Sequence, residues 1–213
     1  MVFLELMVYN NKKFYREEYN MIENRELRAL ARSQLKGNWL MAIGITVVYS
    51  ILISMSGVTV VGPFIVGGPL MLGLYGYFVR RTREEKAEFE CLFEGFKTFV
   101  PAMVLFLLYT LFITLWTMLF IIPGIIKSFS YSMAFYILRD NPGMGGKDAI
   151  TASRKMMDGY KGKLFLLYLS FIGWGILCCL TLGIGFLWLI PYVMQTQANF
   201  YEELRKSQNG AAA

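Results

Sequence analysis

The sequence alternates between long apolar blocks and shorter charged segments. Three blocks, 37–79, 98–138 and 164–201, contain no charged residue other than Lys127. Each block is about twice the roughly 20 residues that one helix needs to cross a bilayer. Because backbone polar groups in lipid must be bonded within the segment, each block predicts two helices joined by a turn. The pattern therefore predicts an all-α, polytopic membrane protein with six transmembrane helices arranged as three hairpins.

Turn-forming residues stand near the middle of each block, at 56–63, 123–124 and 183–185. Before each hairpin lies a segment in which apolar residues recur at helical spacing. Such segments predict amphipathic helices at the membrane surface. The residues that carry the spacing are Leu27, Leu30, Ala31 and Leu35; then Phe89, Leu92, Phe93, Phe96 and Val100; then Ala149, Ser153, Met156, Met157 and Tyr160.

The three hairpins also suggest an internal repeat. Gly37, Gly95 and Gly159 precede the hairpins, and the next charged anchors, Arg80, Arg139 and Glu202, follow at nearly equal spacing. The predicted units are 21–80, 81–139 and 140–204, within a single membrane domain at 21–206. The alternative is that any six-helix protein with charge on one side shows similar spacing.

Charge distribution predicts the orientation. All but one of the 21 basic residues, and all 15 acidic ones, lie outside the apolar blocks. Because basic residues are enriched on the cytoplasmic side, both termini are expected on the cytoplasmic side of the membrane. The formal net charge of +6 then indicates affinity for anionic lipid headgroups rather than nucleic acid. The expected lipid contacts are Arg25, Arg28, Arg32, Lys36, Arg154 and Lys155.

Composition restricts the chemistry. The chain is 56% hydrophobic and 17% charged and has no histidine, the commonest general base and metal ligand. Its three cysteines lack metal-ligand spacing, and no carboxylate lies in an apolar block. We therefore expect no catalytic residue, metal or cofactor, and no ion-coupled pumping, which usually needs an ionisable relay.

Lys127 is the only ionisable residue within a block, which makes it a candidate for function. The favoured interpretation is that its ammonium snorkels to the nearby hairpin tip. The alternative is an anion-attracting polar patch shared with Ser128, Tyr131 and Ser132.

Gln195 and Asn199 share a face of the last predicted helix because they are four residues apart. Hydrogen bonding between helices is the simpler interpretation of these side chains. Lining a polar cavity that contacts a ligand is the alternative.

The two ends differ from the rest of the chain. Residues 1–20 do not match the repeat pattern, and we interpret them as an extension preceding a native start at Met21. Residues 207–213 are expected to be a tail, ending in three alanines.

Three stretches resemble one family. They are 121–125; the run from Arg139 to Pro142; and 148–161, with an N-terminal pattern at 24–39. Together they resemble the domain-of-unknown-function 975 family from about Met21 to Leu204. This resemblance implies a bacterial integral membrane protein, mostly from Gram-positive organisms. The family has no established activity, so it implies no catalytic residues.

Two functions fit these features about equally. The first is binding or moving a lipid, peptide or other amphipathic molecule. The second is a non-transporting scaffold or accessory subunit that docks a protein partner, or a second copy, through its amphipathic helices. An intramembrane enzyme is the least favoured, since it would need an unusual serine–lysine pair at Lys127.

Overall fold

The computed structural model describes residues 21–58 and 61–210, and every regular element in these ranges is helical. This confirms the expected all-α fold for the described part of the chain. The predicted extension at 1–20 and residues 211–213 lie outside the described residues. Residues 207–210, the first part of the expected tail, are helical and form the end of the last helix.

The first hairpin consists of α3 (Trp39–Ser56) and α4 (Gly62–Thr82), preceded by the amphipathic helix α2 (Asn24–Leu35). Gly37 joins α2 to α3 at φ +81°, a left-handed conformation that glycine adopts without steric cost. Leu27, Ala31 and Leu35 are fully buried. Leu30, expected on the same apolar face, is 42% exposed, so the buried face of α2 is narrower than predicted.

The second hairpin is preceded only by one α-helical turn, α5 (Cys91–Glu94), and the 3₁₀ turn η1 (Gly95–Thr98). Its helices are α6 (Phe99–Leu119), α7 (Ile121–Tyr131) and α8 (Ala134–Asp140). The turn falls at the extended residue Phe120 rather than at the expected 123–124. Pro123 instead lies in the first turn of α7, where its missing N–H has no partner to lose.

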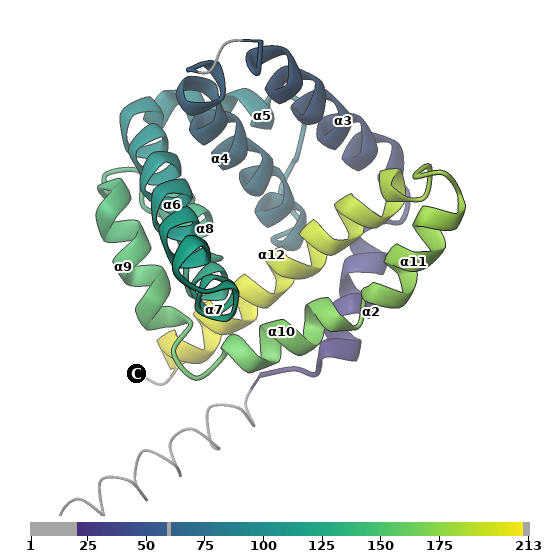
Figure 1. Cartoon of the computed structure of the whole chain (residues 1–213). Helices are drawn as coiled ribbons and strands as arrows, with labels where there is room; N and C mark the ends of the chain where they lie inside the picture. Colours follow the sequence, from purple (N-terminus) through teal and green to yellow (C-terminus); the bar gives the residue numbers. More distant parts are fainter. Residues whose placement is uncertain (1–20, 59–60, 211–213) are drawn as a thin grey trace, which may run out of the picture.

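The third hairpin follows α9 (Gly146–Met156) and consists of α10 (Lys161–Leu169), α11 (Ile172–Leu180) and α12 (Phe186–Gly210). Figure 1 shows α12 in yellow, running diagonally across the molecule with α11 beside its first half. A short helical segment followed by a hairpin thus occurs three times along the chain. Equivalence of the three units as an internal repeat stays a prediction.

Among the described residues, five helical segments are long and apolar enough to cross a membrane. They are Trp39–Ser56, Gly62–Thr82, Cys91–Leu119, Ile121–Asp140 and Lys161–Leu180. The sixth predicted span, within α12, is not one of them. The second half of α12 carries the glutamines, asparagine and charged residues that follow Met194, which lower its hydropathy. The count of six spans therefore stays a prediction.

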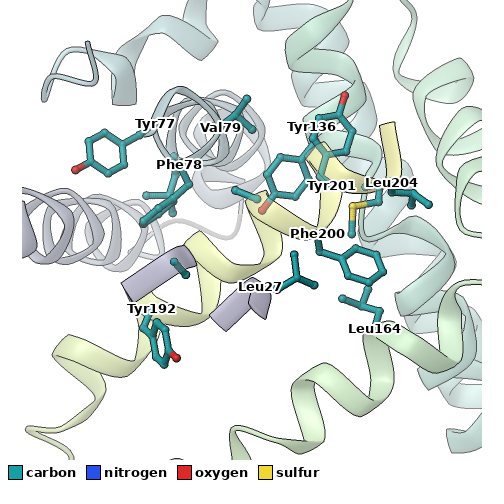
Figure 2. Packing of buried hydrophobic residues seen from close by; sticks show 14 of the residues in the cluster. Leu27, Tyr77, Phe78, Val79, Tyr136, Leu164, Tyr192, Phe200, Tyr201 and Leu204 are labelled. Carbon is teal, nitrogen blue, oxygen red and sulfur yellow. The ribbon is translucent and has the colours of Figure 1, made fainter. Parts of the chain in front are cut away.

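The core lies where α2, α4, α8 and α12 meet. Tyr136 of α8 stacks on Tyr201 of α12 with ring centroids 5.0 Å apart. Figure 2 shows Leu27, Phe200 and Leu164 grouped below this pair. Close helix approach depends on Gly73 of α4, where a Cβ would lie 2.0 Å from the carbonyl oxygen of Leu92. Glycine at such contacts lets backbones approach, as in membrane helix packing generally.

Ion pairs join the three hairpins near the end of the second helix of each one. We call this region, made of Arg83, Asp140, Glu202 and Arg205, the charged end. Arg83, just after α4, contacts Asp140 of α8 at 2.5 Å and Glu202 of α12 at 2.6 Å. Arg205 contacts the same two carboxylates at 3.3 and 3.1 Å. Partial burial lowers the pKa of Arg83, but hydrogen bonds and charge from Asp140 and Glu202 outweigh it and raise the pKa. The guanidinium therefore stays charged and fastens all three hairpins together.

Candidate functional site

A groove of about 430 Å³ separates the α11–α12 hairpin from the α2–α3 junction. We call it the tryptophan groove, because three of the four tryptophans of the chain line it. Its volume lies within the range of small-molecule sites, about 300–1,000 Å³. The lining residues are Arg32, Trp39, Trp174, Leu177, Cys178, Thr181, Gly185, Trp188, Leu189 and Tyr192.

Helical spacing places these side chains on facing surfaces. Trp174, Leu177 and Cys178 recur at three-to-four spacing on α11, and Gly185, Trp188, Leu189 and Tyr192 do so from the tip into α12. Trp174 and Trp188 are each about half exposed, at 52% and 50%. The groove is therefore open along its outer side, between helices that are mostly apolar.

Arg32 is the one charged residue of this lining and lies where α2 nears its end. Its guanidinium donates to the Tyr192 hydroxyl at 3.2 Å and lies 5.6 Å from the centroid of the Tyr192 ring. The Tyr192 hydroxyl in turn donates to the backbone carbonyl of Arg28 at 3.3 Å. Tyrosine thus orients the guanidinium by a hydrogen bond and a cation–π contact.

Arg32 forms no ion pair within the part of the chain that the structure describes. It is exposed, and most of its five donor hydrogens stay available. A guanidinium suits planar bidentate recognition of a carboxylate or phosphate. Tyr192 and Gly185 are seven residues apart, so the apolar wall extends about 10 Å from Arg32 at 1.5 Å per residue. One cationic end and an apolar wall suit an anionic amphiphile.

A second groove, of about 400 Å³, lies between α3 and the start of α12. We call it the serine groove; its lining residues are Thr46, Val47, Ser50, Ile51, Ser54, Met55, Phe186, Leu187 and Ile190. The hydroxyls of Thr46, Ser50 and Ser54 each donate to a backbone carbonyl of α3, at 2.8–3.0 Å. These hydroxyls have already used their only proton, so the groove offers mainly apolar contacts.

Gln195 and Asn199, the predicted polar pair, lie in a buried hydrogen-bond network between helices. The Gln195 amide donates to Gln34 at 2.9 Å, to Thr82 at 2.9 Å and to the Phe78 carbonyl at 3.3 Å. Asn199 accepts from Thr82 at 2.9 Å and donates to the Leu27 carbonyl at 3.3 Å. Neither residue lines the tryptophan groove or the serine groove, and their contacts join α12 to α2 and α4.

Lys127 lies on another hairpin, apart from Gln195 and Asn199. Its ammonium sits 4.8 Å from the ring centroid of Trp116, which anchors it across the α6–α7 hairpin. The Ser128 and Ser132 hydroxyls donate to carbonyls of their own helix, and Tyr131 is buried against Phe112. The ammonium and the two serine hydroxyls of the predicted patch are therefore directed to ring or backbone partners.

The other predicted lipid contacts fall on the surfaces of two helices. Arg25 on α2 and Lys36 just after it are exposed, Arg28 is half-buried beside Arg32, and Arg154 and Lys155 are exposed on α9. Of the six, only Arg32 belongs to a groove. No group of three or more histidine, cysteine, aspartate or glutamate residues that could hold a metal occurs within 21–58 and 61–210.

Two segments of the chain, 21–130 and 118–208, match a family described as protein of unknown function (DUF975). The chain belongs to this family. No curated protein and no solved structure matches it. The resemblance described from the sequence is thus confirmed, and one of the stretches that carry it, 148–161, corresponds to most of α9 and the turn into α10.

In this DUF975 member, residue type alone does not indicate that Trp39, Trp174, Trp188 and Tyr192 line a site. The helical spacing of 174, 177 and 178 and of 185, 188, 189 and 192 was a usable signal. It shows that these residues share faces, but not that the two faces enclose unfilled space.

Proposed function

We propose that this protein binds an anionic amphipathic molecule of lipid-like chemistry in the tryptophan groove. The single observation that carries the proposal is the pairing of one oriented guanidinium, which forms no ion pair among the described residues, with an apolar groove of about 430 Å³. The carboxylate or phosphate of the ligand would pair with Arg32, and its hydrocarbon chain would lie along Trp174 and Trp188.

The proposal places the charged end at the cytoplasmic face of a bacterial membrane, where basic residues are enriched. Arg81 near this end donates to the Gln34 carbonyl at 2.6 Å, so Arg32 also lies close to it. An anionic headgroup of the inner leaflet could then reach Arg32 while its chain stays within the hydrocarbon layer.

The role proposed is binding rather than catalysis. Thr181, the only hydroxyl of the lining besides Tyr192, donates to the Cys178 carbonyl at 2.8 Å and accepts from the Gly185 amide at 3.1 Å. Its proton and one lone pair are thus used in the hairpin turn, and the lining offers no general base to activate it.

The test compares lipids retained during purification in a neutral, mild detergent. Native mass spectrometry is expected to find anionic lipid on the wild type and on Arg25→Gln, but about tenfold less on Arg32→Gln, because a charged hydrogen bond is worth about 1.5–3 kcal/mol. Arg25 is the matched control, since it is an exposed arginine of α2 outside the groove. Equal retention by Arg32→Gln and the wild type would refute the proposal.

A scaffold role is the second candidate, and one feature favours it. A continuous series of ring contacts runs from just before α5 through η1 to the start of α6, with centroids 6.2–6.5 Å apart; its members are Phe89, Phe93, Phe96 and Phe99. Phe93 and Phe96 are 46% and 38% exposed, which suits docking to an apolar partner surface. Under this alternative, Phe93→Ser would abolish capture of a partner, while Arg32→Gln would leave it unchanged.

A further inference from the structure

The α11–α12 tip, residues 172–190, is held together internally. The Thr181 hydroxyl bonds Cys178 on one side and Gly185 on the other, and the Gly183 amide donates to the Cys178 carbonyl at 3.0 Å. The two arms also touch directly, because a Cβ on Gly185 would lie 2.7 Å from the Cys178 sulfur. The tip can therefore move as one body.

The tip consists of two arms, α11 and the start of α12, and the helical hydrogen bonding of each arm is interrupted at the base of the tip. The first arm breaks at Ser170 and Phe171, between α10 and α11. The second contains Pro191, which lacks the N–H that would bond the Leu187 carbonyl. The two weak points lie side by side, since the Phe171 ring packs edge-on against Tyr192 with centroids 5.2 Å apart. Breaks and prolines are the usual places where helices bend.

Space lies on both sides of the tip. Gly185, Trp188 and Leu189 face the tryptophan groove, whereas Phe186, Leu187 and Ile190 face the serine groove. The grooves have similar volumes, about 430 and 400 Å³. Arg32 and Trp39 line the tryptophan groove from outside the tip, so a swing of the tip toward them narrows this groove and widens the serine groove on its other face.

The ligand site adjoins this base. Tyr192, next to Pro191, touches both Arg32 and Phe171. An anion paired with Arg32 would change the contacts of Tyr192, against which Phe171 of the first arm packs. The side chain of Tyr192 therefore takes part both in binding the ligand and in the bending of the tip.

We propose that the tip is a hinged lid that swings about Phe171 and Pro191, closing the tryptophan groove over a bound anionic amphiphile and widening the serine groove in the same motion. The inference rests on the proposed function. A hydrocarbon chain of the surrounding bilayer fills the widened serine groove, since its hydroxyls are already bonded to backbone. The closed lid thereby shields the hydrocarbon chain of the bound ligand from competing lipids.

Two spin-label distances test the lid in the full chain. Exposed Cys179 is replaced by serine, and labels are placed at Ile184→Cys with either Leu40→Cys or Met55→Cys, all exposed positions. Adding phosphatidylglycerol to the protein in a neutral maltoside detergent is expected to shorten the 184–40 distance and lengthen the 184–55 distance. Arg32→Gln is expected to abolish both shifts, whereas Arg25→Gln keeps them. Pro191→Ala restores the missing helix bond and is expected to reduce both shifts while lipid retention persists.

The possible failures are distinguishable. If phosphatidylglycerol is retained and lost with Arg32→Gln but neither distance changes, the lid is refuted and the proposed function stands. If both distances change in the same direction, or shift equally in Arg32→Gln, the coupled swing is refuted. If Arg32→Gln alters neither retention nor distances, the proposed function fails together with the lid.

Discussion

Arg83 and Asp140 join the ends of the first and second hairpins through a 2.5 Å contact, although they are 57 residues apart. Glu202 of α12 accepts from the same guanidinium, so one side chain fastens three helices. The carboxylates of Asp140 and Glu202 have side-chain exposures of 10% and 4%. Buried charges of the same sign depend on their cation, which makes Arg83 a sensitive position.

Arg83→Gln is expected to lower the free energy of unfolding by about 2 kcal/mol, because charged hydrogen bonds to Asp140 and Glu202 are lost and the two buried carboxylates then share Arg205. Thermal unfolding in detergent measures the loss. Lys206→Gln is the matched control, since Lys206 also pairs with a glutamate of α12 but is 67% exposed. Exposed pairs contribute about 0–1 kcal/mol. Equal destabilisation by the two variants would contradict a structural role for Arg83.

Gly73→Ala is expected to destabilise the fold by about 3 kcal/mol or more, because overpacking against rigid backbone cannot relax. The new Cβ would lie 2.0 Å from the Leu92 carbonyl oxygen. Gly44→Ala is the control, since a Cβ there meets no atom of the described residues within 4 Å. Because Gly44 lies in the interior of α3, Gly44→Ala is expected to raise the free energy of unfolding by up to about 1 kcal/mol. Unfolding temperatures that fall equally would contradict the close packing of α4 on α5.

The helical segments could be predicted from the sequence because a bilayer allows few solutions for a long uncharged block. The interruptions inside the blocks could not. The break after Tyr131, for example, depends on Ser153 of α9, whose hydroxyl donates to the Ser130 carbonyl and accepts from the Met133 amide. Such a bond joins residues 20 or more apart, so local propensity does not reveal it.

The site was less predictable than the fold. Arg32 was expected to contact anionic lipid as one of six equivalent basic residues. Its distinguishing partner, Tyr192, lies 160 residues further along the chain. A groove is unfilled space between elements, and periodicity identifies only the faces that border it.

Lys127→Leu is expected to change the free energy of unfolding by no more than about 1 kcal/mol, because Lys127 and Trp116 are both partly exposed and such a cation–π contact contributes little. Lipid retention should stay at the wild-type level, because Lys127 lies on the α6–α7 hairpin and lines neither groove. Native mass spectrometry and thermal unfolding together check this. Loss of anionic lipid to the extent expected for Arg32→Gln would instead support the anion-attracting interpretation of Lys127.

Gln195→Met keeps the length of the side chain but removes its donors to Gln34, Thr82 and the Phe78 carbonyl. Because buried acceptors lose their partner, we expect the free energy of unfolding to fall by about 2 kcal/mol. The control is Gln208→Met, which removes a single bond to the Met156 carbonyl at the partly exposed end of α12. If Gln195 only joins helices, lipid retention is unchanged while the unfolding temperature falls. The opposite result, lost lipid at an unchanged unfolding temperature, would place the ligand at Gln195 and argue against the tryptophan groove.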